Sequence, residues 1–234
     1  MNILVVVAHP DDEVLGMGGT ILKHAIHGDT VTVAYMTTGI TSRRSSKYQN
    51  VSSYGINKKL ELDMKKQIEE LRKDAKKACN LLNVKKFFFF DFPDNEMDTV
   101  PLLKIVKTIE KLVKEIKPER IYTSHYGDLN IDHRVVFEAT LTACRPVRLP
   151  VKEIMCFEIL SSTEWAFTYR FNPNHFININ GELDKKIKAM QVYKNEIKEF
   201  PHPRSVENIK NSAHKWGTVS GFHAAEAFEI IRKS

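Results

Sequence analysis

The feature that most restricts the fold is an alternation of two kinds of segment over the first 145 residues. Short runs rich in β-branched or aromatic residues, typical of strands, occur at residues 3–8, 30–36, 86–90 and 120–124. Over residues 64–82 and 102–116, apolar residues recur at three- and four-residue steps, as they do in amphipathic helices. This alternation predicts βαβ units and an α/β fold with a mainly parallel sheet.

The pattern changes after Arg145. An apolar run at 154–160 and a strand-like segment at 175–179 precede a basic helix that carries Leu183, Ile187, Met190 and Tyr193. One further helical face spans 206–216, and residues 224–231 form either a closing strand or a closing helix. No low-complexity linker separates the two halves, so we expect a single domain over 1–234 with a carboxy-terminal elaboration.

Composition and charge exclude several classes of protein. The chain is 42% hydrophobic and 27% charged, and its formal charge of +6 is spread along the sequence without a basic stripe that would indicate nucleic-acid binding. Its longest apolar runs fall far short of the ~20 residues of a membrane span. Because acidic residues at 11–13 interrupt the first apolar run, we expect no secretion signal and a cytoplasmic location. Cys79, Cys144 and Cys156 lack CxxC spacing and are expected to be buried and free.

Three carboxylates and an imidazole follow the first predicted strand directly, in the run His9-Pro10-Asp11-Asp12-Glu13. Ligands of parallel α/β sheets bind at the carboxyl ends of the strands. Gathering so many polar groups at the end of an apolar strand is costly unless a cation compensates. A divalent metal would do so, with one aspartate as ligand and its neighbour as base. The structural alternative is that an aspartate caps the next helix while His9 lies at the surface.

A second polar cluster, residues 124–134, follows the fourth predicted strand and is expected to meet the first at one edge of the sheet. His133 begins a helix and is a candidate third ligand, and Asp132 is a candidate to orient a neighbouring imidazole. The alternative is that Asp128 and Asp132 are helix caps and that His125 lies at the surface. Two imidazoles and a carboxylate suit a catalytic zinc ion with an open position, although another divalent transition metal would also fit. Such a site supplies hydroxide near neutral pH and polarises a carbonyl, which predicts hydrolysis of an amide or ester.

The AHPDDE run, the Asp132-His133 pair and Ala225-Glu226-Ala227-Phe228 together resemble the LmbE/PIG-L family of zinc-dependent de-N-acetylases, over residues 3–232. The resemblance implies a Rossmann-like three-layer fold. It also implies that His9, Asp12 and His133 bind zinc and that Asp11 is the general base. The implied substrate is a small N-acetylglucosamine-type amino-sugar conjugate, in glycan or glycoconjugate biosynthesis, which releases acetate and the free amine. The oligomeric state is left open.

Asn130 departs from the family pattern, in which His-Pro-Asp-His stands where this chain has Asn130-Ile131-Asp132-His133. The first histidine of that pattern is assigned to the oxyanion or to the leaving amine. An asparagine can donate to an oxyanion but cannot deliver a proton. Either Asp11 returns the proton it first collected, or one of His125, His202 and His223 is the acid, with His223 the favoured histidine.

The remaining candidate residues have weaker signals. Arg43 is expected either to hold an anionic part of the substrate or to be a solvated charge. Asp94, after the third strand, is a candidate acceptor for a sugar hydroxyl. His125 and His202 are also candidates for substrate contact, although the His202 segment fits a plain interhelical turn equally well. Gly16, Gly18 and Gly19 favour close packing of a helix over a nucleotide fingerprint, because their spacing is GxGG.

Two alternative functions remain at this point. One is a hydrolase with the same zinc mechanism that acts on a different amide or acyl group. The other is a non-catalytic nucleotide-binding Rossmann-like module, which would require glycine spacing and a ribose-binding acid that the sequence lacks, since Thr37, Thr38 and Gly39 follow the second strand.

Overall fold

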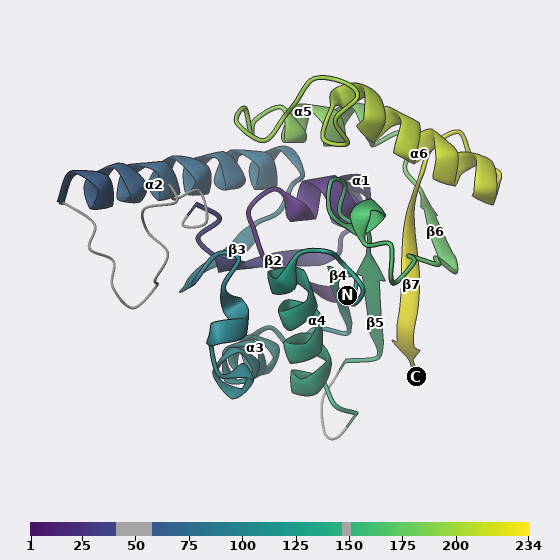
Figure 1. Ribbon diagram of the computed structural model, residues 1–234. Coiled ribbons are helices and arrows are strands. Elements are labelled where there is room, and N and C mark those ends of the chain that lie inside the picture. The colour runs from purple at the N-terminus through teal and green to yellow at the C-terminus, as the bar shows by residue number, and fades with distance from the viewer. Residues whose placement is uncertain (41–57, 147–150) are drawn as a thin grey trace.

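The computed structural model describes residues 1–40, 58–146 and 151–234. Its strands form one sheet in the order β3-β2-β1-β4-β5-β7-β6. Helices cover both faces of this sheet, α3 and α4 on one side and α1, α2, α5 and α6 on the other (Figure 1). This three-layer α/β arrangement confirms the predicted fold class.

The bounds of the elements are as follows. The strands are β1 (Asn2–Val7), β2 (Thr30–Thr37), β3 (Lys86–Phe92), β4 (Arg120–Ser124), β5 (Glu153–Phe157), β6 (His175–Asn178) and β7 (Ala225–Lys233). The α-helices are α1 (Asp12–Ile26), α2 (Lys58–Leu81), α3 (Leu102–Ile116), α4 (Ile131–Ala143), α5 (Leu183–Met190) and α6 (Val206–Ser220). Short 3-10 helices lie at Met97–Thr99 and Thr163–Trp165. No helix within these described ranges is long and apolar enough to cross a membrane.

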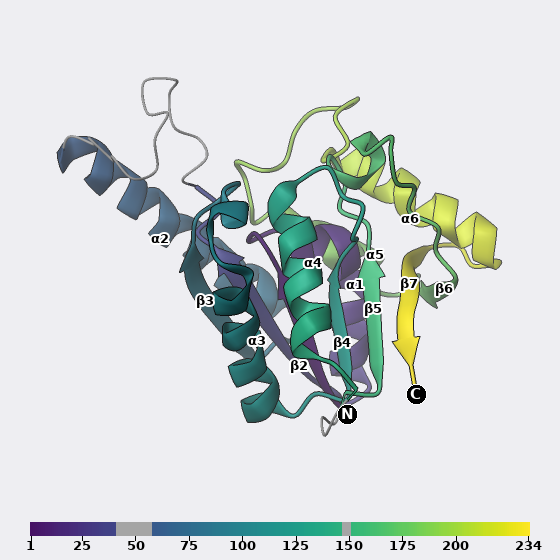
Figure 2. The same ribbon diagram turned by 60° about the horizontal axis from the view of Figure 1, so that its bottom comes forward.

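Strands from both halves of the chain join the sheet. β1 pairs in parallel with β2 and with β4, while β7 is antiparallel to both β5 and β6. The second half of the chain therefore adds β5 in parallel to β4, and then β7 and β6, of which only β7 runs opposite to the other strands (Figure 2). The closing segment that sequence left as strand or helix is the strand β7.

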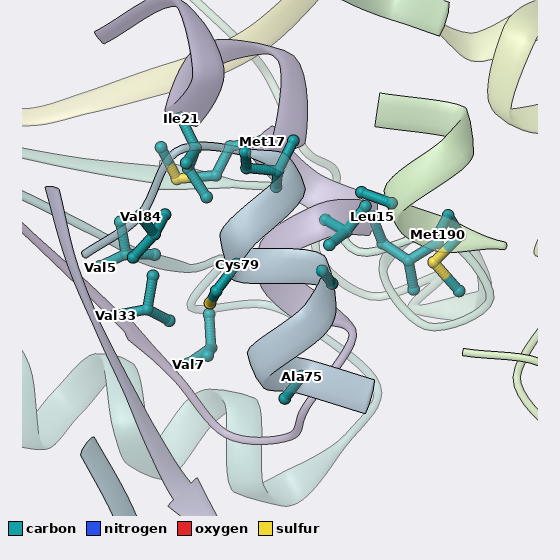
Figure 3. Close-up of a cluster of buried hydrophobic side chains, with 14 of the residues drawn as sticks. Val5, Val7, Leu15, Met17, Ile21, Val33, Ala75, Cys79, Val84 and Met190 are labelled. Carbon is teal, nitrogen blue, oxygen red and sulfur yellow. The ribbon is translucent and has the colours of Figure 1, made fainter. Parts of the chain in front are cut away.

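β1 lies inside the sheet and is buried on both faces, which explains its uninterrupted apolar run. Ile3, Val5 and Val7 point to the side of α1 and α2, and Leu4 and Val6 point to the side of α3 and α4. In Figure 3, Val7 lies next to Cys79 of α2, and Val5 lies next to Val84 and Val33. All three cysteines are buried and free, as expected.

Helix α1 is broken in the middle, because Met17 has non-helical dihedral angles of φ −148° and ψ 25°. A buried ion pair bridges the break. The Glu226 carboxylate of β7 accepts hydrogen bonds from the backbone amides of Gly19 and Thr20, at 3.0 and 2.6 Å. Lys186 of α5 donates to Glu226 at 2.6 Å and to the carbonyl of Leu15 at 2.9 Å. Glu226 thus caps the second half of α1 from the far end of the sequence.

The glycines at the start of α1 allow close packing, as predicted. A Cβ atom on Gly16 would lie 2.0 Å from the Phe157 ring, and one on Gly19 would lie 2.8 Å from Ile179. These distances are too short for any side chain. The glycines therefore serve helix packing, and nothing in their surroundings supports the nucleotide-binding alternative.

Candidate active site and metal centre

The two polar clusters meet at one edge of the sheet. β1 and β4 are neighbouring parallel strands, with Val6 opposite Thr123, so the loops that follow them emerge side by side. His9 belongs to the first loop, Asp12 begins α1, and His133 lies in the first turn of α4. The convergence expected from sequence is thus present.

Three side-chain atoms converge at this edge. Nδ1 of His9 lies 3.1 Å from Nε2 of His133, and Oδ2 of Asp12 lies 3.4 and 3.2 Å from these two nitrogens. Ligand atoms bound to tetrahedral zinc at ~2.0–2.1 Å are about 3.3 Å apart. The second carboxylate oxygen of Asp12 is buried without a hydrogen-bond partner. Donor types and spacing therefore fit a divalent metal.

The other nitrogen of His9 is held by carboxylates. Nε2 lies 3.1 Å from Oδ2 of Asp132 and 3.0 Å from Oδ1 of Asp94. Asp132 is itself fixed by the backbone amides of Asn95 and Met97, at 2.6 and 3.0 Å. A proton on Nε2 leaves Nδ1 as the ligand atom, which is the usual service of a carboxylate to a metal-binding histidine. Asp132 stands where it was expected to orient an imidazole. Asp94, which was expected to accept from a sugar hydroxyl, also contacts His9.

Asp128 performs the same service for His133, a role that sequence reasoning missed. Its Oδ1 lies 2.9 Å from Nδ1 of His133. The hydroxyl of Thr163 donates to Oδ2 of Asp128 at 2.5 Å, and the hydroxyl of Ser162 donates to Oδ1. The available signal was the position of Asp128 after β4, which was interpreted as a possible helix cap.

The acidic surroundings control protonation of the two imidazoles. Burial opposes a charge on His133, but Asp12 and Asp128 overcome it and raise its pKa to about 9. The same balance, with Asp12, Asp132 and Asp94 as partners, raises the pKa of His9 well above its usual value. The pKa of Asp12 is lowered, against its burial, by both histidines. Since metal ligands must be neutral imidazoles, a cation that binds here displaces protons.

Asp11 sits at a strained turn beside the three candidate ligands. Its φ of 115° is unusual for a residue other than glycine, and its backbone amide donates to Oε2 of Glu13 at 3.0 Å. Glu13 in turn accepts from the hydroxyl of Tyr193 at 2.7 Å. Burial raises the pKa of Asp11 well above its usual value, against the opposing guanidinium of Arg204. A carboxylate whose pKa is raised is a stronger base than an ordinary one, which suits a proton acceptor.

Arg204 is the second residue that sequence reasoning missed. Its Nη1 donates to Oδ2 of Asp11 at 2.7 Å and to Glu196 at 3.1 Å, and its Nε donates to the hydroxyl of Ser161 at 2.6 Å. The sequence signal was the rigid Pro-His-Pro-Arg-Ser segment, in which His202 was the predicted site residue. His202 accepts from the backbone amide of Arg204 and faces Trp165.

A cavity of about 100 Å³ opens beside these groups, enough for a few water molecules or a small polar group. It is lined by His9, Pro10, Asp11, Gly39, Asp94, Asn95, Asn130, Glu196 and Arg204. Asn130 also caps α4: its Oδ1 accepts from the amide of Asp132 at 2.8 Å, and its Nδ2 donates to Asn95 at 2.9 Å.

The other predicted site residues do not line this cavity. Arg43 lies outside the described residues. His125 is fully buried, accepts from the amide of Gly127 at 3.1 Å and faces Glu229 at 3.5 Å. His223 is exposed beyond the end of α6, so the structure does not bring it to the crevice as expected. The reason is the strand order: β7, which follows His223, lies two strands away from β4, or about 10 Å sideways.

The family described as GlcNAc-PI de-N-acetylase, PIG-L, matches residues 4–144, a stretch that includes His9, Asp12 and His133. The chain belongs to the PIG-L family. A relative from Bacillus cereus, a probable N-acetyl-alpha-D-glucosaminyl L-malate deacetylase 2, is 26% identical over 227 residues, or 94% of this chain and 96% of its own length.

Solved structures share the fold at lower identity. An N,N'-diacetylchitobiose deacetylase from Pyrococcus horikoshii has a TM-score of 0.73 at 20% identity, covering 99% of this chain and 84% of its own. A 4-carboxy-2-hydroxymuconate hydratase from Pseudomonas putida has a TM-score of 0.76 at 19% identity, covering 100% and 97%. Because the fold accommodates both reactions, the choice of reaction depends on the site and the family.

Proposed function

We propose that this PIG-L family protein is a metal-dependent deacetylase that hydrolyses the acetamide of an N-acetylglucosamine-type sugar or conjugate. The observation that carries the proposal is the convergence of His9, Asp12 and His133 beside a small polar cavity that His9 lines. Family membership and deacetylase relatives favour this reaction over the alternatives. Zinc is the ion we assign, because two nitrogens and one oxygen are a common zinc donor set. A cytoplasmic location stays a prediction, which cell fractionation would check.

In this mechanism, His9, Asp12 and His133 hold the ion, which when bound supplies a Lewis acid for the amide carbonyl. Asp11 accepts the proton of the attacking water. Its turn is held by Glu13, and Arg204 fixes one carboxylate oxygen, so the other is the oxygen that we assign to proton transfer.

The tetrahedral oxyanion also needs a hydrogen-bond donor. Asn130 lines the cavity and uses one N–H of its amide toward Asn95, so its second N–H is the donor that we assign to the oxyanion. No candidate histidine lines the cavity apart from His9, so we assign the return of the proton to the leaving amine to Asp11 as well.

Metal analysis combined with acetate release tests this proposal. Purified protein should hold about one divalent ion per chain, and His9→Ala and His133→Ala should each lose both the ion and the activity. His214→Ala, which removes an exposed imidazole on α6, is the matched control and should keep both. Full metal content in both ligand variants, or no acetate from any N-acetylated amino sugar tried with metal-loaded protein, would contradict the proposal.

The role of Asp11 has its own test. Asp11→Asn should keep the ion and lose turnover by about 100-fold or more, because a carboxamide cannot accept the proton. His125→Gln and His223→Gln should keep the pH profile of the unmodified protein if Asp11 carries the proton in both directions. Loss of metal from Asp11→Asn would make Asp11 a ligand, and a shifted pH profile in either histidine variant would restore that histidine as the acid.

A further inference from the structure

A second and larger cavity, of about 270 Å³, lies where the loop between β5 and β6 meets α6. We call it the aromatic cavity, because its lining includes Phe167, Tyr169, Phe171 and Trp216. Its volume is just below the range of about 300–1,000 Å³ that is typical of ligand pockets. It therefore has room for a single ring-sized group.

Aromatic side chains are exposed around this cavity in a way that core packing does not explain. Phe167 is 89% exposed and Tyr169 is 58% exposed, and Trp165, on the same loop, is 43% exposed. Tyr126, from the loop after β4, adds a fourth exposed ring 6.5 Å from that of Tyr169. Large apolar side chains that gather on a surface beside a cavity mark a binding site.

Polar groups surround these aromatic rings and hold some of them in place. The half-buried carboxylate of Glu158 accepts from the indole N–H of Trp216 and faces the Ser212 hydroxyl at 3.3 Å. The ammonium of Lys215 lies 4.1 Å from the centre of the Trp216 ring. Arg170 also lines the cavity. The cavity thus presents aromatic faces with hydrogen-bond donors at their edges.

We call the small cavity beside Asp11 and Arg204 the catalytic cavity. Only a few residues separate it from the aromatic cavity. Thr163 lines the aromatic cavity, and its hydroxyl donates to Asp128, which holds the metal-ligand candidate His133. Ser161 accepts from Arg204, which lines the catalytic cavity. A ligand that fills both cavities would therefore place one group in each cavity, and the two groups would adjoin.

We propose that the aromatic cavity binds the sugar residue next to the one that is deacetylated, so that the preferred substrate is a disaccharide or longer glycan. This inference rests on the proposed function. A pyranose ring has apolar C–H faces that pack on aromatic rings and hydroxyl groups at its edge, and the cavity supplies partners for both. A lipid chain would need a wholly apolar lining, which Lys215, Arg170 and Glu164 rule out.

The test compares deacetylation of N-acetylglucosamine with that of its dimers in β1→3, β1→4 and β1→6 linkage. The best dimer should have a kcat/KM at least tenfold above that of the monomer. In Phe167→Ala and in Tyr169→Ala this ratio should fall below threefold, because each variant removes one stacking surface. Leu103→Ala, which removes a 65% exposed side chain on α3, is the control and should keep the ratio.

The outcomes separate this inference from the proposed function. Acetate release with a dimer-to-monomer ratio near one, or a ratio unchanged in both aromatic variants, would overturn the sugar subsite and leave the deacetylase in place. If no sugar releases acetate, the proposed function fails, and calorimetric titration with the dimers then tests the cavity alone. Binding that weakens at least fivefold in Phe167→Ala would support the subsite, whereas equal or absent binding would overturn it.

Discussion

The buried pair of Lys186 and Glu226 should contribute strongly to stability, and its removal can be predicted in some detail. Both residues are nearly inaccessible to solvent, at 5% and 3% exposure. Lys186→Met leaves the Glu226 carboxylate buried, with the amides of Gly19 and Thr20 as its remaining donors. Removal of one partner from a buried ion pair costs about 3–5 kcal/mol of unfolding free energy.

The double variant Lys186→Met/Glu226→Gln distinguishes this explanation from a simple loss of contacts. It leaves no charge at the positions of this pair, and the Gln carbonyl still accepts from one of the two backbone amides. Both variants leave the Leu15 carbonyl without its Lys186 donor, and the double variant adds one unsatisfied backbone amide, at about 1–3 kcal/mol, in place of an unpaired buried carboxylate. The double variant should therefore be more stable than Lys186→Met alone. The surface variant Lys107→Met is the control: its partner Glu110 lies one helical turn away at 2.8 Å, and its effect should stay within about 0.5 kcal/mol.

Urea unfolding followed by circular dichroism measures all of these variants. The linear extrapolation gives the unfolding free energy, and an unchanged m-value shows that the change lies in stability itself. The reasoning is refuted if Lys186→Met costs less than about 1 kcal/mol, or if the two substitutions simply add.

Three further outcomes follow from the structure. Gly16→Ala should destabilise by about 1–3 kcal/mol because its new methyl group meets the buried Phe157 ring, whereas Gly181→Ala, with no atom within 4 Å, should not, by the same urea assay. Asp128→Asn should weaken metal affinity about 10- to 100-fold in a chelator competition, and unchanged affinity would contradict its supporting role. Burial raises the pKa of Glu13 from 4.5 to about 7, so ionisation of this carboxyl opposes folding. As the pH rises from 4.5 to 7, the metal-free protein should therefore lose up to about 3 kcal/mol of stability relative to Glu13→Gln. A difference that does not vary with pH would argue against a buried Glu13.

The parts of the site that sequence predicts are those fixed by local order. His9 and Asp12 directly follow β1, and His133 opens the helix after β4. The general rule that parallel strands end at one edge is then enough to bring these residues together. The strands themselves are predicted from their apolar runs, which reflect burial on both faces of the sheet.

The parts that sequence misses depend on contacts between distant segments. Arg204 reaches Asp11 across 193 residues, and Ser162 reaches Asp128 across 34. Neither contact can be inferred from a pattern of residues that are near one another in the sequence. His223 shows the opposite error, because proximity was inferred without knowing that β5 separates β7 from β4.

The cap on α1 also sets an order of events during synthesis. Glu226 follows Thr20 by 206 residues, which at 5–20 residues per second is about 10–40 seconds of translation. During that interval the second half of the helix has no acceptor for its first amides. Because Asp12 and Glu13 begin the same helix, a newly made chain completes the support of the helix that carries them only after β7 has been translated and paired.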